Sequence, residues 1–175
     1  MNRLYPPTLE DIPISNNNPS FTDLLRSPTL LLAFGFGSGL APKAPGTFGT
    51  VAAIPLWLLL CQLPLSLYWA LVVFSAIAGI YICGRASSKL GVHDHSGIVW
   101  DEFVGLWIAL AFIEPQLTSI IVGFLLFRFF DIVKPWPISW LDKQVGAGIG
   151  IMIDDVVAGF FAAIVIVVIS NLGFL

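Results

Sequence analysis

The longest uncharged segment of the chain, residues 44–84, reads APGTFGTVAAIPLWLLLCQLPLSLYWALVVFSAIAGIYICG. It is long enough for two membrane-spanning helices, because each span needs about 20 apolar residues. The natural turn between them is Leu63-Pro64-Leu65-Ser66, since proline breaks the helical hydrogen-bond ladder. We therefore expect one helix over about residues 47–62 and a second over about residues 66–83.

The composition of the whole chain agrees with a membrane location. The 175 residues are 57% hydrophobic and only 11% charged, against roughly 25% charged residues in an ordinary soluble domain, and the mean hydropathy is +0.91. The formal net charge of -3 leaves no basic surface of the kind that attracts nucleic acid. We expect an integral membrane protein with membrane lipids around it and no nucleic-acid partner.

The chain before this segment divides into two parts. Residues 1–27 are rich in Asn, Pro and Asp and lack the basic and apolar regions of a signal peptide, so we expect a flexible cytoplasmic tail followed by a membrane-embedded domain over residues 28–175. Residues 27–42 are uncharged but glycine-rich, and Arg26 and Lys43 bracket them. If both basic residues stay in water on one side, this segment is re-entrant or interfacial.

The apolar segment over residues 98–130 permits either one long helix or a hairpin that turns at Glu114-Pro115. The hairpin is favoured, because a single span would hold Glu114 near the middle of the bilayer at a cost of roughly 2.5 kcal/mol or more. The last span would cover Val156 to about Ser170. The prediction is an all-α polytopic helical bundle of about five short spans, with an N-terminal re-entrant or interfacial segment.

This arrangement puts the basic side chains on one side of the membrane, which the positive-inside rule makes cytoplasmic. These are Arg26, Lys43, Arg85, Lys89, Arg128, Lys134 and Lys143. The acids that fall on the same side, although they were not used to choose it, are Asp94, Asp101, Glu102, Asp131, Asp154 and Asp155.

Acidic pairs occur at two places where apolar segments meet polar ones, Asp101-Glu102 and Asp154-Asp155. Carboxylates so close to hydrocarbon need a partner or a cation, and small residues such as Gly105 beside them leave room for close helix packing. Oxygen ligands without sulfur suit Mg²⁺. The alternative is that Asp154-Asp155 merely complements a helix dipole.

Basic groups near these acids would suit a phosphate. Arg128, Lys134 and Lys43 are candidates, together with the loop residues His93 and His95. The segment from Pro45 to Thr50 also offers backbone N–H groups at a helix start, including that of Thr47. Each has a plainer reading: Arg128 and Asp131 could form only an intrahelical ion pair, the lysines could only mark topology, and the histidines could be solvated.

Four motifs then resemble one family. They are Gly35-Phe36-Gly37-Ser38-Gly39-Leu40-Ala41-Pro42 with Ala44-Pro45-Gly46-Thr47, Val92-His93-Asp94-His95 with Trp100-Asp101-Glu102-Phe103, Arg128-Phe129-Phe130-Asp131 with Lys134-Pro135-Trp136-Pro137, and Gly150-Ile151-Met152-Ile153-Asp154-Asp155. In this order, over about residues 30–165, they are similar to bacterial phosphatidylglycerophosphatase A. Thr50 stands where serine is expected.

The resemblance implies a Mg²⁺-dependent phosphatase of the bacterial inner membrane that converts phosphatidylglycerophosphate to phosphatidylglycerol and phosphate. It implies metal ligands among Asp101, Glu102, Asp154 and Asp155, and substrate contacts from Lys43, Thr47, Arg128 and Lys134. The catalytic candidates are Asp131, as base or nucleophile, with His93, His95 and Asp94. Attack by water and attack by an Asp carboxylate both stay open, as does the oligomeric state.

Three other functions were considered. An alcohol phosphotransferase would resemble Asp-x-x-Asp-Gly-x-x-Ala-Arg, and a histidine-type lipid phosphatase would need Pro-Ser-Gly-His; the chain contains neither. A small ion transporter also uses membrane carboxylates, but there the acids should lie near the midplane rather than at one face.

Overall fold

The computed structural model describes residues 18–92, 95–136, 138 and 147–173. Every regular element in those ranges is helical, which confirms the all-α fold class. The elements are α1 (Phe21–Arg26), α2 (Pro28–Ala33), η2 (Gly35–Leu40), α3 (Pro45–Leu60), α4 (Leu65–Leu90), α5 (Trp100–Ala109), α6 (Leu117–Val133) and α8 (Ala147–Asn171).

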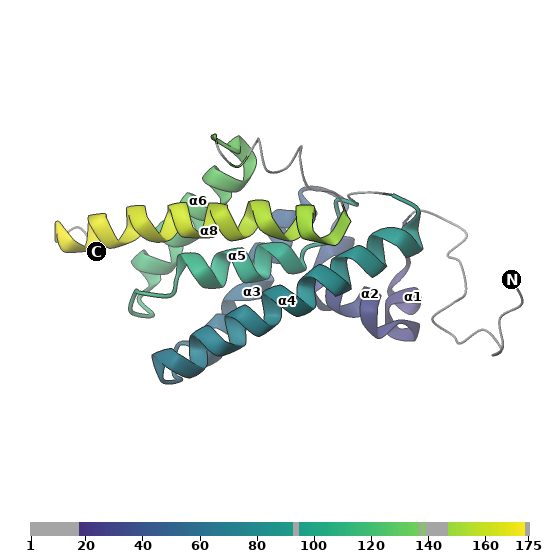
Figure 1. Ribbon diagram of the computed structural model, residues 1–175, viewed down its shortest axis with the longest axis horizontal. Helices are drawn as coiled ribbons and strands as arrows, with labels where there is room; N and C mark the ends of the chain where they lie inside the picture. The colour runs from purple at the N-terminus through teal and green to yellow at the C-terminus, as the bar shows by residue number, and fades with distance from the viewer. Residues whose placement is uncertain (1–17, 93–94, 137, 139–146, 174–175) are drawn as a thin grey trace, which may run out of the picture.

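The short helix α5 lies at the centre of the bundle. All ten of its residues are buried, and it packs against α3, α4, α6 and α8. Figure 1 shows α4 and α8 running in opposite directions along the long axis, with α1 and α2 beside the C-terminal end of α4. The start of α5, which carries Asp101 and Glu102, is therefore enclosed by four other helices.

Glycines bring α5 and α8 into backbone contact. A Cβ atom added to Gly159 would overlap the carbonyl oxygen of Gly105, and one added to Gly105 would lie 2.8 Å from the carbonyl oxygen of Asp155. No larger residue fits this crossing without separating the helices. The close packing that the sequence predicted beside the acidic pairs is confirmed.

Both predicted turns are present. Helix α3 ends at Leu60 and α4 begins at Leu65, so the break falls at the predicted turn around Pro64. Helix α5 ends at Ala109 and α6 begins at Leu117, so a turn that contains Glu114 replaces the alternative of one long helix. Proline and an acid in the same apolar segment thus located the hairpin correctly.

Two helix ends differ from the sequence prediction. Helix α4 continues past Cys83 to Leu90, because Ala86 and Leu90 form a buried face while Arg85 and Ser88 stay exposed. Gly91 then ends it in the left-handed conformation, with φ of 67°.

Helix α8 begins at Ala147, before the acidic pair rather than after it. Asp154 and Asp155 therefore lie about two turns inside the helix. Their alternative role as complements of the helix dipole loses its basis, since that effect is confined to the first turn.

The packed part of the N-terminal region begins before residue 28. Ser20 caps α1 through a reciprocal capping box with Asp23, and Leu24 on α1 is fully buried. Part of the region predicted as a tail is therefore folded onto the domain. Helix α2 and η2 follow as two short elements, and the chain changes direction within η2 at Phe36 and Gly37, both with positive φ. Residues 27–42 therefore do not form one long helix.

Two helices in the described part of the chain are long and apolar enough to cross a membrane, Leu65–Leu90 and Gly148–Asn171. Helix α4 presents an apolar outer face, on which Phe74, Ile77 and Tyr81 are 64–67% exposed. These two helices indicate membrane association. The arrangement of five spans stays a prediction.

Candidate active site

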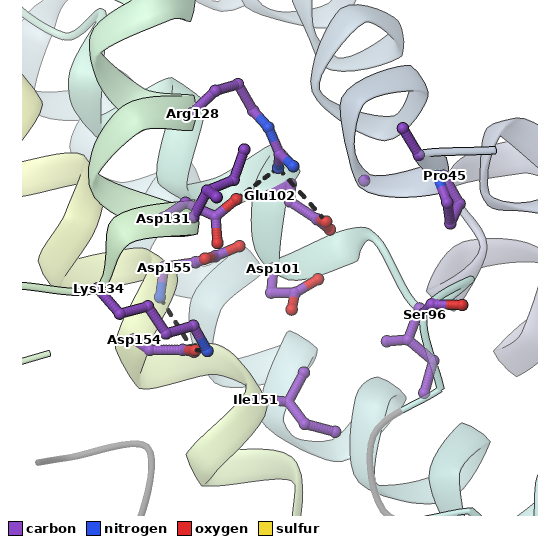
Figure 2. A pocket seen from close by; sticks show the side chains of 14 residues that line it. Pro45, Ser96, Asp101, Glu102, Arg128, Asp131, Lys134, Ile151, Asp154 and Asp155 are labelled. Carbon is purple, nitrogen blue, oxygen red and sulfur yellow. Dashed lines mark hydrogen bonds and ion pairs between the residues drawn. The ribbon is translucent and has the colours of Figure 1, made fainter. Parts of the chain in front are cut away.

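A polar pocket of about 290 Å³ lies where α3, α5, α6 and α8 meet. Its charged lining residues are Asp101, Glu102, Arg128, Asp131, Lys134, Asp154 and Asp155. Figure 2 shows their side chains turned toward a common space, with Pro45 and Ser96 on the opposite side from Lys134 and Asp154. The three acid-bearing segments of the sequence thus meet in space.

Three carboxylates form the inner part of the pocket. Asp101, Glu102 and Asp155 each offer an oxygen, and these oxygens lie within 4.8 Å of one another. The residues are only 9%, 9% and 3% exposed. Glu102 Oε2 is buried and has no hydrogen-bond partner among the residues that the structure describes. Buried carboxylates with an unmatched oxygen fit a divalent cation with oxygen ligands.

Arg128 connects three elements at the pocket wall. Its Nη1 lies 2.5 Å from Asp131 Oδ2 on the same helix and 3.7 Å from Glu102 Oε1 on α5. It also donates to Thr50 Oγ1 on α3, at 3.4 Å. The predicted contact between Arg128 and Asp131 is present. The guanidinium also contacts Glu102 and Thr50, so its role is not limited to an intrahelical ion pair.

Lys134 approaches the pocket from the end of α6. It is the C-cap residue, with φ of 43°, a left-handed conformation that is uncommon for a non-glycine residue. Its Nζ forms an ion pair with Asp154. Such strained positions concentrate at functional sites, and here the turn directs the ammonium group toward α8. Asp154 therefore lines the pocket as the partner of Lys134, apart from the three clustered carboxylates.

The start of α3 forms the remaining wall. Ala44 also adopts a left-handed conformation, with φ of 48°, and Gly46 follows so closely against Glu102 that a Cβ atom there would overlap Glu102 Oε1. Thr50 is fully buried and donates to the Gly46 carbonyl at 2.8 Å. The absence of side chain at Gly46 lets the α3 backbone touch the acidic cluster.

Sequence reasoning missed Thr50 and Ser96 as site residues. In the sequence Thr50 stands out only as the end of the Pro45–Thr50 segment and as a hydroxyl residue where serine is expected, yet its side chain accepts a hydrogen bond from Arg128. Its spacing of one helical turn after Gly46 was the available signal. Ser96 lines the pocket from the loop before α5, and nothing in its sequence context indicated this.

Three of the predicted residues, Lys43, Thr47 and His95, do not line this pocket. Lys43 is exposed and Thr47 half-buried, and neither lines it, although Ala44 and Gly46 do. His95 lines a neighbouring pocket instead. His93 and Asp94 lie outside the described residues, so their predicted catalytic roles stay predictions.

The acids and bases of the pocket fit the class of membrane-associated enzymes that act on phosphate esters, where a cation and basic side chains share the charge of a phosphoryl group. Residues 31–170 match the family model described as Phosphatidylglycerophosphatase A. The chain belongs to this family and is a phosphatase.

Curated relatives from three bacteria are similar over most of their length. The chain is 49% identical over 140 residues to Phosphatidylglycerophosphatase A of Escherichia coli, which covers 79% of this chain and 81% of that protein. It is 46% identical to the Haemophilus influenzae protein of the same name, over 87% of this chain and 95% of that protein. A Bacteroides thetaiotaomicron protein, provisionally named as a phosphatidylinositol-3-phosphatase, is 42% identical over 79% of this chain and 91% of that protein. No solved structure matches the chain.

Proposed function

We propose that this phosphatase hydrolyses phosphatidylglycerophosphate to phosphatidylglycerol and inorganic phosphate, with Mg²⁺, at the cytoplasmic face of the bacterial inner membrane. The observation that carries the proposal is the convergence of three buried carboxylates with Arg128 and Lys134 in one pocket. Membership of the phosphatidylglycerophosphatase A family supplies the substrate.

The acidic cluster would hold the metal through Asp101, Glu102 and Asp155. The unmatched Glu102 Oε2 supports this assignment, because a buried carboxylate oxygen that lacks a hydrogen-bond partner is costly. Asp154, predicted as a fourth ligand, instead would fix Lys134 beside the cluster. When bound, Mg²⁺ supplies charge neutralisation at the phosphoryl oxygens and lowers the pKa of a coordinated water.

Arg128 and Lys134 would bind the terminal phosphate. Both line the pocket and both are held by carboxylates, Arg128 by Asp131 and Lys134 by Asp154. A guanidinium can engage two phosphoryl oxygens at once, and its hydrogen bond to Thr50 fixes its orientation. Lys43 and Thr47, at the edge of the same loop and helix start, would contribute at longer range.

Asp131 is the candidate for the chemical step. It lines the pocket beside Arg128, where it could take a proton from an attacking water or attack phosphorus itself. In either case the bond between phosphorus and the glycerol oxygen breaks, and the leaving alkoxide takes up a proton. The overall reaction adds one water and releases an alcohol and a phosphate.

Metal dependence tests the proposal directly. Purified protein should release phosphate from phosphatidylglycerophosphate with Mg²⁺, stop in EDTA and recover when Mg²⁺ is restored. Asp155→Asn should abolish turnover in a folded protein, whereas the matched control Glu114→Gln, an exposed acid in the α5–α6 turn, should not. Full activity in EDTA would show that turnover does not require a metal ion. Faster hydrolysis of phosphatidylinositol 3-phosphate than of phosphatidylglycerophosphate would contradict the proposed substrate.

The orientation has its own test. In a background without Cys61, a cysteine introduced by Ser88→Cys at the exposed end of α4 should be labelled from the cytoplasm. One introduced by Glu114→Cys in the α5–α6 turn should be labelled from the other side. Labelling of both from one side would contradict the predicted topology.

A further inference from the structure

A second pocket, of about 370 Å³, adjoins the acidic pocket. Pro45 and Ser96 line both, so the two cavities share a wall. Figure 2 shows these two residues on the side of the acidic pocket away from Asp154 and Lys134. A ligand whose phosphate lies among the charged groups would have to pass Pro45 and Ser96 to reach the second pocket.

His95 is the ionisable side chain in the wall of this second pocket, and its position is fixed at several points. Its carbonyl accepts from the Ile98 N–H at 2.8 Å, and the Val99 N–H donates to the Ala33 carbonyl at 2.8 Å, which ties the loop to α2. Its ring lies 5.5 Å from the Phe34 ring, centre to centre. The imidazole is held by the fold rather than free in a loop.

The hydrogen bonds define which ring nitrogen faces a ligand. The Gly97 N–H donates to His95 Nδ1 at 3.0 Å, so in the neutral ring the proton is on Nε2. Nε2 lies 3.3 Å from the amide oxygen of Asn18. This contact is long for a hydrogen bond, and the Nε2–H group can serve a better acceptor in the pocket.

The rest of the lining combines main chain with apolar side chains such as Phe34, Leu40 and Pro42. A Cβ atom on Gly39 would overlap the Gly97 carbonyl, so η2 and the loop before α5 touch through their main chains. Ligand pockets are commonly lined by apolar groups with a few placed polar groups that fix the ligand's orientation. Asn18 also lines the pocket, and it lies outside residues 31–170 that match the family model.

We propose that the second pocket binds the phosphodiester and glycerol portion of the lipid headgroup, with His95 Nε2–H donating to a phosphodiester oxygen. The proposal rests on the proposed function, because it assigns the part of the same substrate that adjoins the terminal phosphate. His95 is then a substrate-binding residue that distinguishes a headgroup with a phosphodiester from a simple phosphomonoester.

Two variants separate the two nitrogens of His95. Asparagine reproduces the acceptor at Nδ1 but not the donor at Nε2, whereas glutamine reproduces the donor but not the acceptor. Binding of glycerophosphoglycerol, the headgroup without acyl chains, and of inorganic phosphate is measured on the purified full chain. His95→Asn should weaken glycerophosphoglycerol roughly tenfold, as for a lost hydrogen bond to a charged acceptor, and leave phosphate binding unchanged. His95→Gln should stay within about threefold of wild type.

Other outcomes overturn the proposal. Wild-type affinity for glycerophosphoglycerol in His95→Asn would show that Nε2 does not donate to it, and equal weakening of both ligands would make His95 a residue that shapes the whole site. If His95→Asn does not fold, a loss of glycerophosphoglycerol binding in His95→Gln decides against the proposal. Ser88→Ala, on the exposed face of α4, is the control. Binding is read without turnover, so failure to hydrolyse the lipid would refute the proposed function separately.

Discussion

Gly46→Ala is a small change that places one methyl group against the acidic cluster. The added Cβ would lie 3.2 and 3.3 Å from the two terminal nitrogens of Arg128 and would overlap Glu102 Oε1. The backbone of α3 is buried here, so the carboxylate and the guanidinium have to move. The substitution therefore tests whether the pocket geometry is needed for activity.

The expected effect on stability is modest and the effect on rate is large. Overpacking costs about 1–3 kcal/mol, offset by about 1 kcal/mol because alanine is a better helix former than glycine. The net loss of about 0–2 kcal/mol corresponds to a fall in Tm of several degrees at most in a chain of this size. A catalytic group displaced by about 1 Å loses about 100-fold in rate, so a shift of a few tenths of an ångström to 1 Å should lower kcat/KM by about 10- to 100-fold.

Phosphate release from phosphatidylglycerophosphate in detergent micelles measures the rate, and thermal unfolding measures the stability. The matched control is Gly84→Ala on α4, where the added Cβ would come no closer than 3.4 Å to Gly148. That variant should keep wild-type turnover. Wild-type kcat/KM in a folded Gly46→Ala variant would show that catalysis does not require the close contact between α3 and the acidic cluster.

Three further outcomes are expected. In steady-state assays Arg128→Lys should chiefly raise KM, because lysine loses the bidentate geometry of the guanidinium, and Asp131→Asn should chiefly lower kcat, because asparagine keeps the shape of the side chain without its charge. Near-normal turnover in the double variant would show that the pair has only a structural role. Tyr68→Phe removes the hydroxyl that donates to the Trp107 carbonyl. It should lower the free energy of unfolding by about 1 kcal/mol and leave kcat unchanged, as thermal unfolding and turnover assays would show. Lost activity at unchanged Tm would contradict this. Gly159→Ala should raise the Mg²⁺ concentration for half-maximal activity at least tenfold, measured by metal titration, since it separates α5 from α8; an unchanged titration would show that the crossing does not position the ligands.

The sequence predicted what depends on pattern over long segments. The Glu114-Pro115 pair located the α5–α6 turn, and the one-sided acids predicted that Asp101, Glu102 and Asp155 would meet. The prediction had grouped Asp154 with these three acids, and the structure pairs Asp154 with Lys134 instead. Both inferences rest on the cost of placing charge in an apolar environment, which acts on whole segments.

The details that sequence reasoning missed depend on local packing. Helix α4 reaches Leu90 because Ala86 and Leu90 are buried where α4 packs in the bundle, with α2 among its neighbours, which overrides the polar character of Arg85 and Lys89. His95 lines the second pocket rather than the acidic one, and its Nδ1 accepts a hydrogen bond from the Gly97 N–H. Such contacts form only in the folded chain, and the hydrophobic periodicity of the sequence does not predict them.

The crossing of Gly105 and Gly159 has an evolutionary consequence. Gly105 lies one helical turn from Asp101, and Gly159 one turn from Asp155. The glycines that let the two helices touch are therefore next to the acids on both helices. A drift to alanine at either glycine would widen the gap between two ligand-bearing helices, and no substitution at a single acid could restore it. Helix packing and metal chemistry are therefore constrained to change together, which leaves this seam fewer neutral substitutions than the exposed face of α4.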